Sequence, residues 1–236
     1  MMTIIVDDFG YSREVNLLVQ EGFRVGAIDG AALMVNRPGT DDALNYAQSS
    51  HKQIGLHLNL TEGRPMLPVT QIPSLVDQTG HFFGWPHLVR RLLSGSTKQA
   101  EVLAEAEAQL KLFTSRRQPD FFNSHHHVHL FPDLFGPLAA LAADFGIKRI
   151  RAPRRIWWPS LRLPQAAKAL TIQFLGRSQR THSPMPLAPL LVDLDWADQR
   201  PEALAVLFAQ LPDDVELICH PHPSPSTLQW LINKKR

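Results

Sequence analysis

The chain carries 11 histidines, and the densest group of them is the run NSHHHVH at positions 123–129. If this run continued the apolar strand predicted before it, His125, His127 and His129 would share one face. Imidazoles at this spacing can converge on a metal ion, while neighbouring side chains fix which ring nitrogen carries the proton. The run is internal and follows an apolar segment, so it is not a purification tag. Metal binding explains it better than a purely structural role in a core.

Two adjacent carboxylates, Asp7 and Asp8, follow the apolar segment TIIV. Adjacent carboxylates at the end of a strand repel each other unless a cation or a shared proton lies between them. In parallel α/β folds, this end of a strand is where functional sites are built. A structural alternative is equally compatible with the segment, since Asp8 or Ser12 could cap the helix that follows.

The segment GLHLNLTEG at positions 55–63 alternates strictly between apolar and polar residues after its glycine. A strand with this pattern would turn its leucines toward a helix layer and its polar side chains toward a barrel interior. The polar side chains are His57, Asn59 and Thr61. A single inward histidine is usually a hydrogen-bonded core residue, but a row of histidine, asparagine and threonine favours a ligand-binding role.

Two further polar residues stand at the ends of apolar segments. His220 follows the segment VELIC, and Arg151 ends the segment KRIR. His220 would emerge at the same end of the sheet as the other histidines, although an ordinary loop position is equally compatible with its place. Arg151 could hold an anionic group or orient a carboxylate, and a surface ion pair is an equally good interpretation.

If the strands are parallel, their carboxyl ends lie at the same edge of the sheet, which is the mouth of the predicted site. These side chains would then lie close together at that mouth. One aspartate and two histidines, with coordination positions left open, suit Zn²⁺, Mn²⁺, Fe²⁺, Co²⁺ or Mg²⁺. A metal held in this way lowers the pKa of a bound water and polarises a carbonyl group. The clusters therefore point to metal-assisted hydrolysis.

Short apolar segments alternate with longer amphipathic ones along the chain. The segments predicted as strands are Thr3–Asp7, Ala31–Val35, Gln53–Asn59, Asp120–His127, Lys148–Ala152, Leu190–Leu194 and Val215–Cys219. The segments predicted as helices are Arg13–Phe23, Thr40–Ser50, Thr97–Ser115, Asp133–Phe145 and Pro201–Leu211. Pro201 suits a first helical position, and Asp133 could cap its helix. This alternation predicts an α/β fold of about seven parallel strands with crossover helices.

The alternation alone is compatible with a closed barrel or with an open, doubly wound sheet. Neither G-x-G-x-x-G nor a P-loop sequence follows the first strand, which gives little support to nucleotide binding. Segments rich in proline or glycine are expected to be loops that line a binding site. These segments are Gly63–Trp85, Ala152–Pro164 and Ser183–Pro189. They contain Trp85, Trp157 and Trp158, whose rings could stack on a sugar.

A chain of 236 residues with 44% hydrophobic residues can bury one sizeable core, so a single domain over residues 1–236 is expected. The 24 basic and 22 acidic residues nearly balance, which argues against nucleic acid or a membrane surface as a partner. Cys219 is the only cysteine, which excludes an intrachain disulfide and a multi-thiolate zinc site. No leader or membrane span is visible, so the cytoplasm is the expected compartment.

The chain resembles the YdjC-like carbohydrate deacetylase family, which includes chitooligosaccharide deacetylases and deacetylases associated with hopanoid biosynthesis. The matching segments, in the family's order, are DDFGYS with Asn16, GLHLNLTEGRP, EAEAQLKLF, NSHHHVHLFP, KRIRAP and ELICHP. They extend from Asp7 to Pro221. The histidine run together with DDFG is specific, whereas either motif alone would not be. The chain is shorter than is usual for the family within Ala152–Leu190 and after His220.

The resemblance implies a distorted (β/α) TIM-like barrel that binds one divalent metal ion, Mg²⁺ or Zn²⁺. Carried over to this chain, the metal ligands would be Asp8, His57 and His125. The catalytic base would be Asp7, and the general acid would be His220. The side chains expected to contact the substrate or to support the metal ligands are Asn59, Thr61, His127, His129 and Arg151.

The resulting hypothesis is a metal-dependent hydrolase that removes an acetyl group from an N-acetylated sugar, such as an oligosaccharide or glycolipid containing N-acetylglucosamine. One alternative is a family member that binds metal or sugar without turnover. Another is a different metal hydrolase, such as a phosphoesterase, although two-metal phosphoesterases usually need more carboxylates at the mouth. An inert barrel with core histidines is the least favoured. A homodimer is compatible with the sequence, which does not determine the oligomeric state.

Overall fold

Seven parallel strands form one sheet in the computed structural model, which describes residues 2–152, 155–157, 174, 190–196, 201–212, 215–221 and 227–235. Their order across the sheet is β4-β3-β2-β1-β7-β6-β5. The strands are β1 (Thr3–Phe9), β2 (Gly30–Leu33), β3 (Gln53–Leu58), β4 (Phe122–Ser124), β5 (Arg155–Trp157), β6 (Leu190–Asp193) and β7 (Glu216–Cys219). Because every pairing is parallel, the carboxyl ends of the strands lie at one edge of the sheet.

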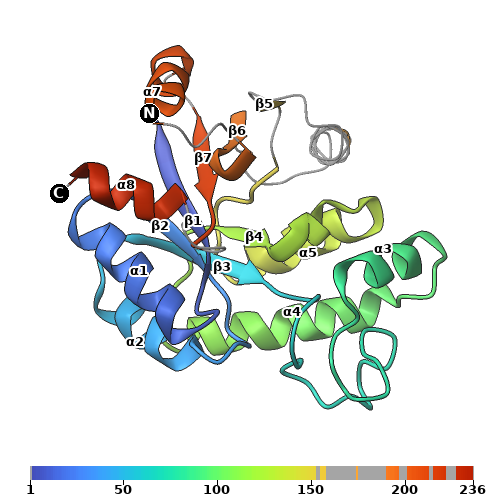
Figure 1. Ribbon diagram of the computed structural model, residues 1–236. Helices are drawn as coiled ribbons and strands as arrows, with labels where there is room; N and C mark the ends of the chain where they lie inside the picture. Colours follow the sequence, from blue (N-terminus) through green and yellow to red (C-terminus); the bar gives the residue numbers. More distant parts are fainter. Residues whose placement is uncertain are drawn as a thin grey trace.

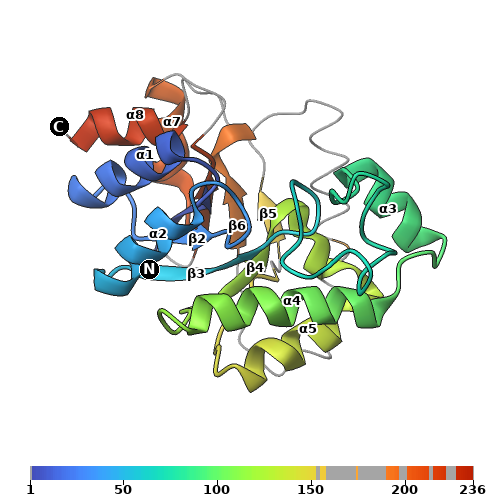
Figure 2. The ribbon, with the colours of Figure 1, turned by 90° about the horizontal axis from the view of Figure 1, so that it is seen from below.

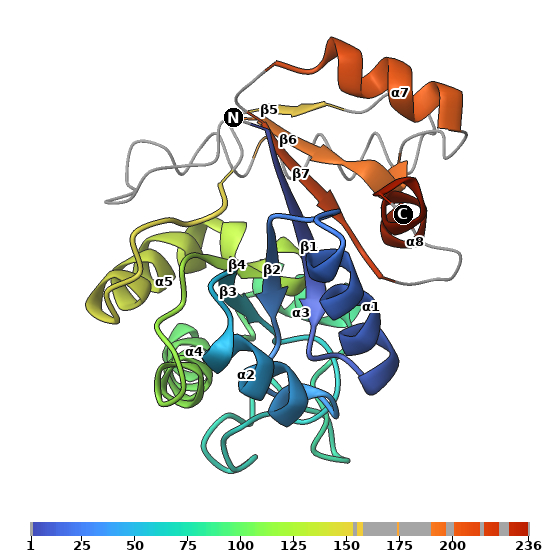
Figure 3. The same cartoon turned by 90° about the vertical axis from the view of Figure 1, so that its left-hand side faces the viewer.

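Helices connect the strands and lie around the outside of the sheet (Figure 1). They are α1 (Arg13–Arg24), α2 (Thr40–Ser49), α3 (Trp85–Leu93), α4 (Gln99–Thr114), α5 (Pro132–Asp144), α7 (Pro201–Gln210) and α8 (Thr227–Lys235). Figure 2 shows α4 and α5 packed side by side. In Figure 3, α1, α2, α4 and α5 form an arc around a sheet that curls into a half-barrel. Among the described residues, no helix combines the length and the apolar character needed to cross a membrane.

The predicted α/β fold of about seven parallel strands is confirmed, and so is its barrel-like curvature. β1 lies in the middle of the sheet between β2 and β7, so segments from both ends of the chain meet there. Leu56, Leu58 and Leu60 are buried, as their alternation predicted. His57 points the other way and is buried as well, so both faces of β3 are covered, as in other parallel sheets.

The strand predicted at Lys148–Ala152 is wrong. Only Ile150 of this segment forms a β-bridge, with Phe122 of β4. The next strand, β5, lies within the segment that was predicted to be a loop beginning at Ala152. The physical reason is that β4 has only three residues, because the chain turns at His125. A strand at 148–152 would therefore have too few residues of β4 to pair with.

The segment Gly63–Trp85 was predicted to be a loop, and it contains no regular helix or strand before α3 begins at Trp85. A single antiparallel bridge joins Val76 to Phe82. α3 itself was not predicted from the sequence. Its second residue is Pro86, which is well tolerated in the first turn of a helix because its missing N–H has no partner there in any case.

The start of α5 also differs from its prediction. The helix begins at Pro132, its capping residue is Phe131, and no side chain caps it. Asp133 therefore lies within the first turn, where its negative charge interacts favourably with the helix dipole. The prediction that Asp133 caps the helix is wrong. The loop predicted at Ser183–Pro189 and the residue Trp158 lie outside the described residues.

Candidate metal centre and active site

The end of β1 is irregular, and this irregularity brings two aspartates to the same cluster of side chains. The pairing of β1 with β2 shifts its register between Val6 and Phe9, and Asp8 has a φ of 65°. In a regular strand, Asp7 and Asp8 would point to opposite faces of the sheet. Aspartate enters the left-handed region more readily than most residues, but at a cost in backbone strain. Strain of this kind is typical of functional sites.

The turn that follows Asp8 is held by Asn16 of α1. The Gly10 N–H donates to Asn16 Oδ1 at 2.8 Å, and Asn16 Nδ2 donates to the Gly39 carbonyl at 2.8 Å. Gly10 has a φ of 90°, and a Cβ there would lie 2.5 Å from the Met34 carbonyl oxygen, so no other residue fits. The segment DDFGYS and Asn16 therefore act together to hold the turn that follows Asp8.

The cap of α1 decides between the two interpretations of the aspartate pair. Ser12 is the capping residue, and its Oγ accepts a hydrogen bond from the Val15 N–H at 3.3 Å. Its backbone is extended, as is usual for such a position. Asp8 is therefore not needed as a cap, and its carboxylate points into the site instead.

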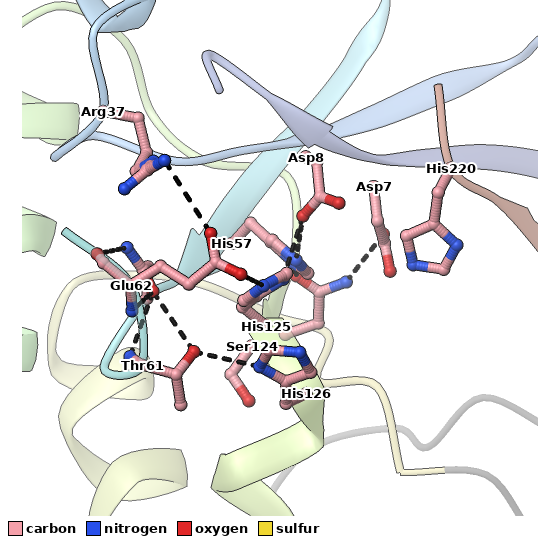
Figure 4. Close-up of polar contacts among 12 residues, drawn as sticks. Asp7, Asp8, Arg37, His57, Thr61, Glu62, Ser124, His125, His126 and His220 are labelled. Carbon is pink, nitrogen blue, oxygen red and sulfur yellow. Dashed lines mark hydrogen bonds and ion pairs between the residues drawn. The ribbon is translucent and has the colours of Figure 1, made fainter. Parts of the chain in front are cut away.

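The three side chains predicted to bind metal lie together (Figure 4). Asp8 Oδ1 lies 3.2 Å from His57 Nε2 and 3.0 Å from His125 Nδ1. One oxygen or nitrogen atom from each residue lies within 4.8 Å of the others. The exposed fractions of the three residues are 1%, 1% and 7%. One carboxylate and two imidazoles around a common point are the donor set of a mononuclear metal site with open positions.

A chain of hydrogen bonds shows which ring nitrogen of His57 is a donor. Asn123 Nδ2 donates to Asp7 Oδ1 at 3.2 Å, which turns Asn123 Oδ1 toward His57 Nδ1, 2.7 Å away. Since the amide oxygen can only accept, His57 Nδ1 carries a proton. The other nitrogen, Nε2, then faces Asp8 Oδ1 at 3.2 Å, and no well-formed hydrogen bond reaches that nitrogen. A buried imidazole nitrogen that faces a carboxylate suits a cation between them, so these residues fit a divalent metal ion.

Asp8 and His125 form a buried pair of opposite charges. Burial alone raises the pKa of Asp8, but the contact with His125 holds that pKa well below its ordinary value. Burial alone lowers the pKa of His125, but hydrogen bonds with Asp8 and Glu62 raise it to about 9. A metal ion that binds through His125 Nδ1 must displace the proton there, so metal binding is coupled to proton release.

The histidine run does not continue its strand. β4 ends at Ser124, and the chain then bends at His126 and His127, whose φ values of 53° and 56° lie in the left-handed region and not in that of a 3₁₀ helix. Ser124 Oγ accepts from the His129 N–H at 3.0 Å and closes the turn. The prediction that His125, His127 and His129 share one strand face is therefore wrong. The hydrogen bond between His129 and Ser124 stabilises a turn at the place where an extended strand was expected.

The histidines of the turn have different surroundings. His125 is the member that reaches the candidate metal centre. His126 Nδ1 lies 3.0 Å from Thr61 Oγ1, at the rim of the site. His129 Nε2 lies 2.6 Å from the Arg151 carbonyl oxygen, and burial lowers the pKa of His129 to about 3. His129 is thus a neutral residue that holds the turn against the neighbouring segment.

Arg151 is buried behind the site. Its Nη1 donates to Asp7 Oδ2 at 2.6 Å, and its Nε donates to Glu216 Oε1 at 2.6 Å. Burial alone raises the pKa of Asp7, but the charge of the Arg151 guanidinium outweighs it and lowers that pKa. Arg151 therefore orients a carboxylate, which is one of the three interpretations considered for it. The interpretation as a surface ion pair is wrong, because the Arg151 side chain is 1% exposed.

His220 lies just beyond β7, beside Asp7 (Figure 4). Asp195, in the short 3₁₀ turn Leu194–Trp196, accepts hydrogen bonds at one oxygen from the His220 N–H at 2.8 Å and from Nδ1 at 2.7 Å. Thr227 Oγ1 donates to the other oxygen at 2.6 Å. Burial lowers the pKa of His220, but the bond to Asp195 and the nearby carboxylates raise it to about 10. His220 is therefore protonated at neutral pH.

Three polar residues on α4 hold the loop that borders the site. Glu101, Glu105 and Gln109 are spaced by four residues, so they share one face of the helix. They are 8%, 0% and 0% exposed. A helix that buries such residues must provide them with partners, and here the partners are backbone groups of the loop at 59–84.

These three side chains contact the backbone of the loop at Asn59, Met66, Leu67 and Ser74. Glu101 accepts a hydrogen bond from the Ser74 N–H at 2.6 Å. Glu105 accepts hydrogen bonds from the N–H groups of Met66 and Leu67 at 2.9 and 3.0 Å. Gln109 accepts from the Asn59 N–H at 3.1 Å and donates to the Asn59 carbonyl at 2.8 Å. The loop thus follows the axis of α4. The segment EAEAQL, which forms part of the family resemblance, is explained by this role in positioning the loop.

Asn59 shapes the start of the same loop. Its Oδ1 accepts from the N–H groups of Thr61 and Glu62, both at 3.1 Å, and its Nδ2 donates to the Glu62 carbonyl at 2.8 Å. The residue is fully buried. Of the two roles considered for Asn59, these contacts favour support of the site over direct contact with a substrate.

Sequence reasoning did not assign a role to several residues that the structure brings to the site. They are Glu62, Asn123, His126 and Asp195. The first three lie within motifs that the sequence singled out, so their neighbours in the chain were a usable signal. Asp195 lies outside these motifs, although it directly follows the strand predicted at Leu190–Leu194, and this position at the end of a strand was its one signal.

The chain is similar to known proteins over most of its length. The family model described as "YdjC-like protein" matches residues 1–229. The chain belongs to the YdjC-like family. The predicted family resemblance is thereby confirmed over almost the entire length of the chain.

Relatives of this YdjC-like chain carry names that refer to deacetylation. A carbohydrate deacetylase of Geobacillus stearothermophilus is 31% identical over 219 residues, which are 85% of this chain and 86% of that protein. A chitooligosaccharide deacetylase of Yersinia pestis (strain Pestoides F) is 28% identical over 226 residues, 94% of this chain and 81% of that protein. A carbohydrate deacetylase of Danio rerio is 35% identical over 154 residues, and the match spans about half of its length, 49%.

A solved structure also resembles this YdjC-like chain. It is a proposed cellobiose-phosphate cleavage protein of Enterococcus faecalis V583, with a TM-score of 0.66 and 26% sequence identity. The similarity covers 97% of this chain and 83% of that one. The curled parallel sheet and its helices are therefore shared well beyond the candidate metal centre.

Proposed function

We propose that this YdjC-like protein is a metal-dependent hydrolase that removes the acetyl group from an N-acetylated sugar. The observation that carries the proposal is the buried convergence of Asp8, His57 and His125 in a chain whose relatives are named carbohydrate deacetylases. Asp8 is the one carboxylate in this cluster, and Asp7 is tied to Arg151. This donor set favours a single metal ion over the two-metal arrangement of many phosphoesterases.

The proposed reaction is hydrolysis of an amide. A bound divalent cation, Mg²⁺ or Zn²⁺, supplies a Lewis acid that polarises the acetamide carbonyl and makes water more acidic. Asp7 takes a proton from the water that attacks the carbonyl carbon, and His220 gives a proton to the sugar nitrogen as the C–N bond breaks. The products are acetate and a free amino sugar. Arg151 and Asn123 hold Asp7 in place, and Asp195 holds His220.

The rim of the site offers surfaces that could contact the sugar. The Trp85 ring stacks on His126, with ring centroids 5.4 Å apart and 24° between the planes. His126 also contacts Thr61, so this group extends from the candidate metal centre toward the loop at 59–84. An aromatic surface beside a hydrolytic centre suits the apolar face of a sugar ring.

Acetate release from N-acetylglucosamine oligomers tests the proposed function. The wild-type protein should release acetate with added Mg²⁺ or Zn²⁺ and stop after treatment with a chelator, because the cation polarises the amide. His125→Ala should lose both cation binding and activity, since it removes one of three buried ligands. His51→Ala, at an exposed position, is the matched control and should retain both.

Two outcomes would contradict parts of this proposal. Full activity in His125→Ala would reject the assigned centre. Cation binding by the wild-type protein without acetate release from any N-acetylated sugar oligomer would favour a binding protein that does not turn over.

The pH dependence of the reaction provides a separate prediction for His220. A general acid works only while protonated, so activity should fall as pH rises through about 10. Asp195→Asn keeps an acceptor oxygen but removes the charge that raises this pKa, while Asp8 and Asp193 still contribute. The alkaline limb of the kcat profile should therefore move to lower pH.

The measurement is kcat against pH at a fixed concentration of free cation. Asp144→Asn, at the exposed end of α5, should leave the profile unchanged. An alkaline limb at the same pH in Asp195→Asn and the wild type would show that His220 is not the proton donor or that Asp195 does not act on it.

A further inference from the structure

The two histidines of the candidate metal centre present different ring nitrogens to Asp8. His57 presents Nε2, whereas His125 presents Nδ1. In each ring the other nitrogen faces a side-chain oxygen. His57 Nδ1 lies 2.7 Å from Asn123 Oδ1, and His125 Nε2 lies 3.3 Å from Glu62 Oε1. An acceptor on the far side of a metal-binding histidine fixes its tautomer and its orientation.

Glu62 is held in place by more than one element. Its backbone N–H and carbonyl are both bonded to the side chain of Asn59. The backbone N–H and carbonyl of Asn59 are in turn bonded to the side chain of Gln109 on α4. Arg37 Nη2 lies 3.7 Å from Glu62 Oε2, the oxygen that does not face His125. The carboxylate therefore has a defined position at the rim, where its side chain is 34% exposed.

We propose that Glu62 is a positioning residue for the metal ligand His125. Its carboxylate accepts the proton on Nε2, which leaves the lone pair of Nδ1 free for a divalent cation. The negative charge also makes the imidazole a stronger donor. The inference rests on the proposed metal centre, and it extends that centre to the loop that α4 holds. The chain of contacts runs from Gln109 through Asn59 and Glu62 to His125.

Zn²⁺ affinity, measured on the full chain by competition with a chromophoric chelator, tests this role. Glu62→Ala should weaken Zn²⁺ binding by about 10–100-fold, because the acceptor that fixes His125 is lost. Glu62→Gln should bind with intermediate affinity, since its amide oxygen still accepts the proton but carries no charge. Glu107→Ala is the control: it removes an exposed carboxylate on α4 that pairs with Lys111, and it should bind like the wild type.

A spectroscopic readout separates positioning from a merely structural role. In the Zn²⁺-loaded wild-type protein, ¹⁵N NMR should show the metal on His125 Nδ1 and a slowly exchanging proton on Nε2. In Glu62→Ala the Nε2 proton should exchange faster, while circular dichroism shows an intact fold. Unchanged affinity and unchanged Nε2–H exchange in Glu62→Ala would overturn the inference. A wild-type protein that binds no Zn²⁺ would instead contradict the proposed metal centre itself.

Discussion

Asp7→Asn should slow acetate release by about 10²–10⁴-fold, the usual contribution of a general base, while the variant still binds its cation. Asparagine keeps the size of the side chain and an acceptor oxygen for Arg151, but it cannot take a proton from water. The metal ligands Asp8, His57 and His125 are untouched. Initial rates with N-acetylglucosamine oligomers give the effect on activity, and calorimetric titration with Zn²⁺ gives the effect on binding.

Asp144→Asn is a suitable control, since it makes the same chemical change at an exposed residue and should retain the full rate. Full activity in Asp7→Asn would reject the role of Asp7 as base. A loss of cation binding in Asp7→Asn would show that Asp7 also supports the metal centre, through its hydrogen bond to Asn123 and from there to His57.

Arg151→Met should lower the free energy of unfolding by about 3–5 kcal/mol, because removing the cation of a buried ion pair leaves the charge of the buried carboxylate uncompensated. Arg151 bonds Asp7 and Glu216, and the exposed fractions of the two acidic side chains are 2% and 8%. Methionine fills most of the volume but neutralises neither carboxylate. Urea denaturation at neutral pH, followed by circular dichroism, measures the change.

The matched control replaces an arginine whose ion pair is exposed. Arg24 pairs with Glu21 on α1 and its side chain is 68% exposed, so the free energy of unfolding of Arg24→Met should match that of the wild type within the error of the measurement. In the double variant Asp7→Asn with Arg151→Met, part of the loss should be recovered, since one of the two buried charges is gone. Wild-type stability in Arg151→Met would contradict a structural role for this buried pair.

The position of the candidate metal centre could be predicted from the sequence because it follows from a simple geometric rule. Parallel strands end at one edge of the sheet, so polar residues at their carboxyl ends must lie near one another. Asp8, His57 and His125 obey this rule, since each lies in or directly after a different strand. The rule needs only the strand pattern to place the groups at one edge. The choice of these three residues as metal ligands came from the family resemblance.

The surroundings of that centre could not be predicted in the same way. A strand period places His127 and His129 beside His125, but the hydrogen bond from the His129 N–H to Ser124 Oγ turns the chain and separates them. Likewise, EAEAQL has the composition of an ordinary surface helix. Its burial of Glu105 becomes understandable only when the loop backbone is in place to donate hydrogen bonds to that carboxylate.

The sequence by itself determined the α/β fold, the parallel strands and the edge at which the reactive residues gather, because these depend on periodicity along the chain. Only the tertiary structure decided which atoms face each other. Arg151 bonds Asp7 across 144 residues and Glu216 across 65, and Glu62 reaches His125 across 63. Contacts at such separations depend on how elements pack, and no local pattern of residues records that packing.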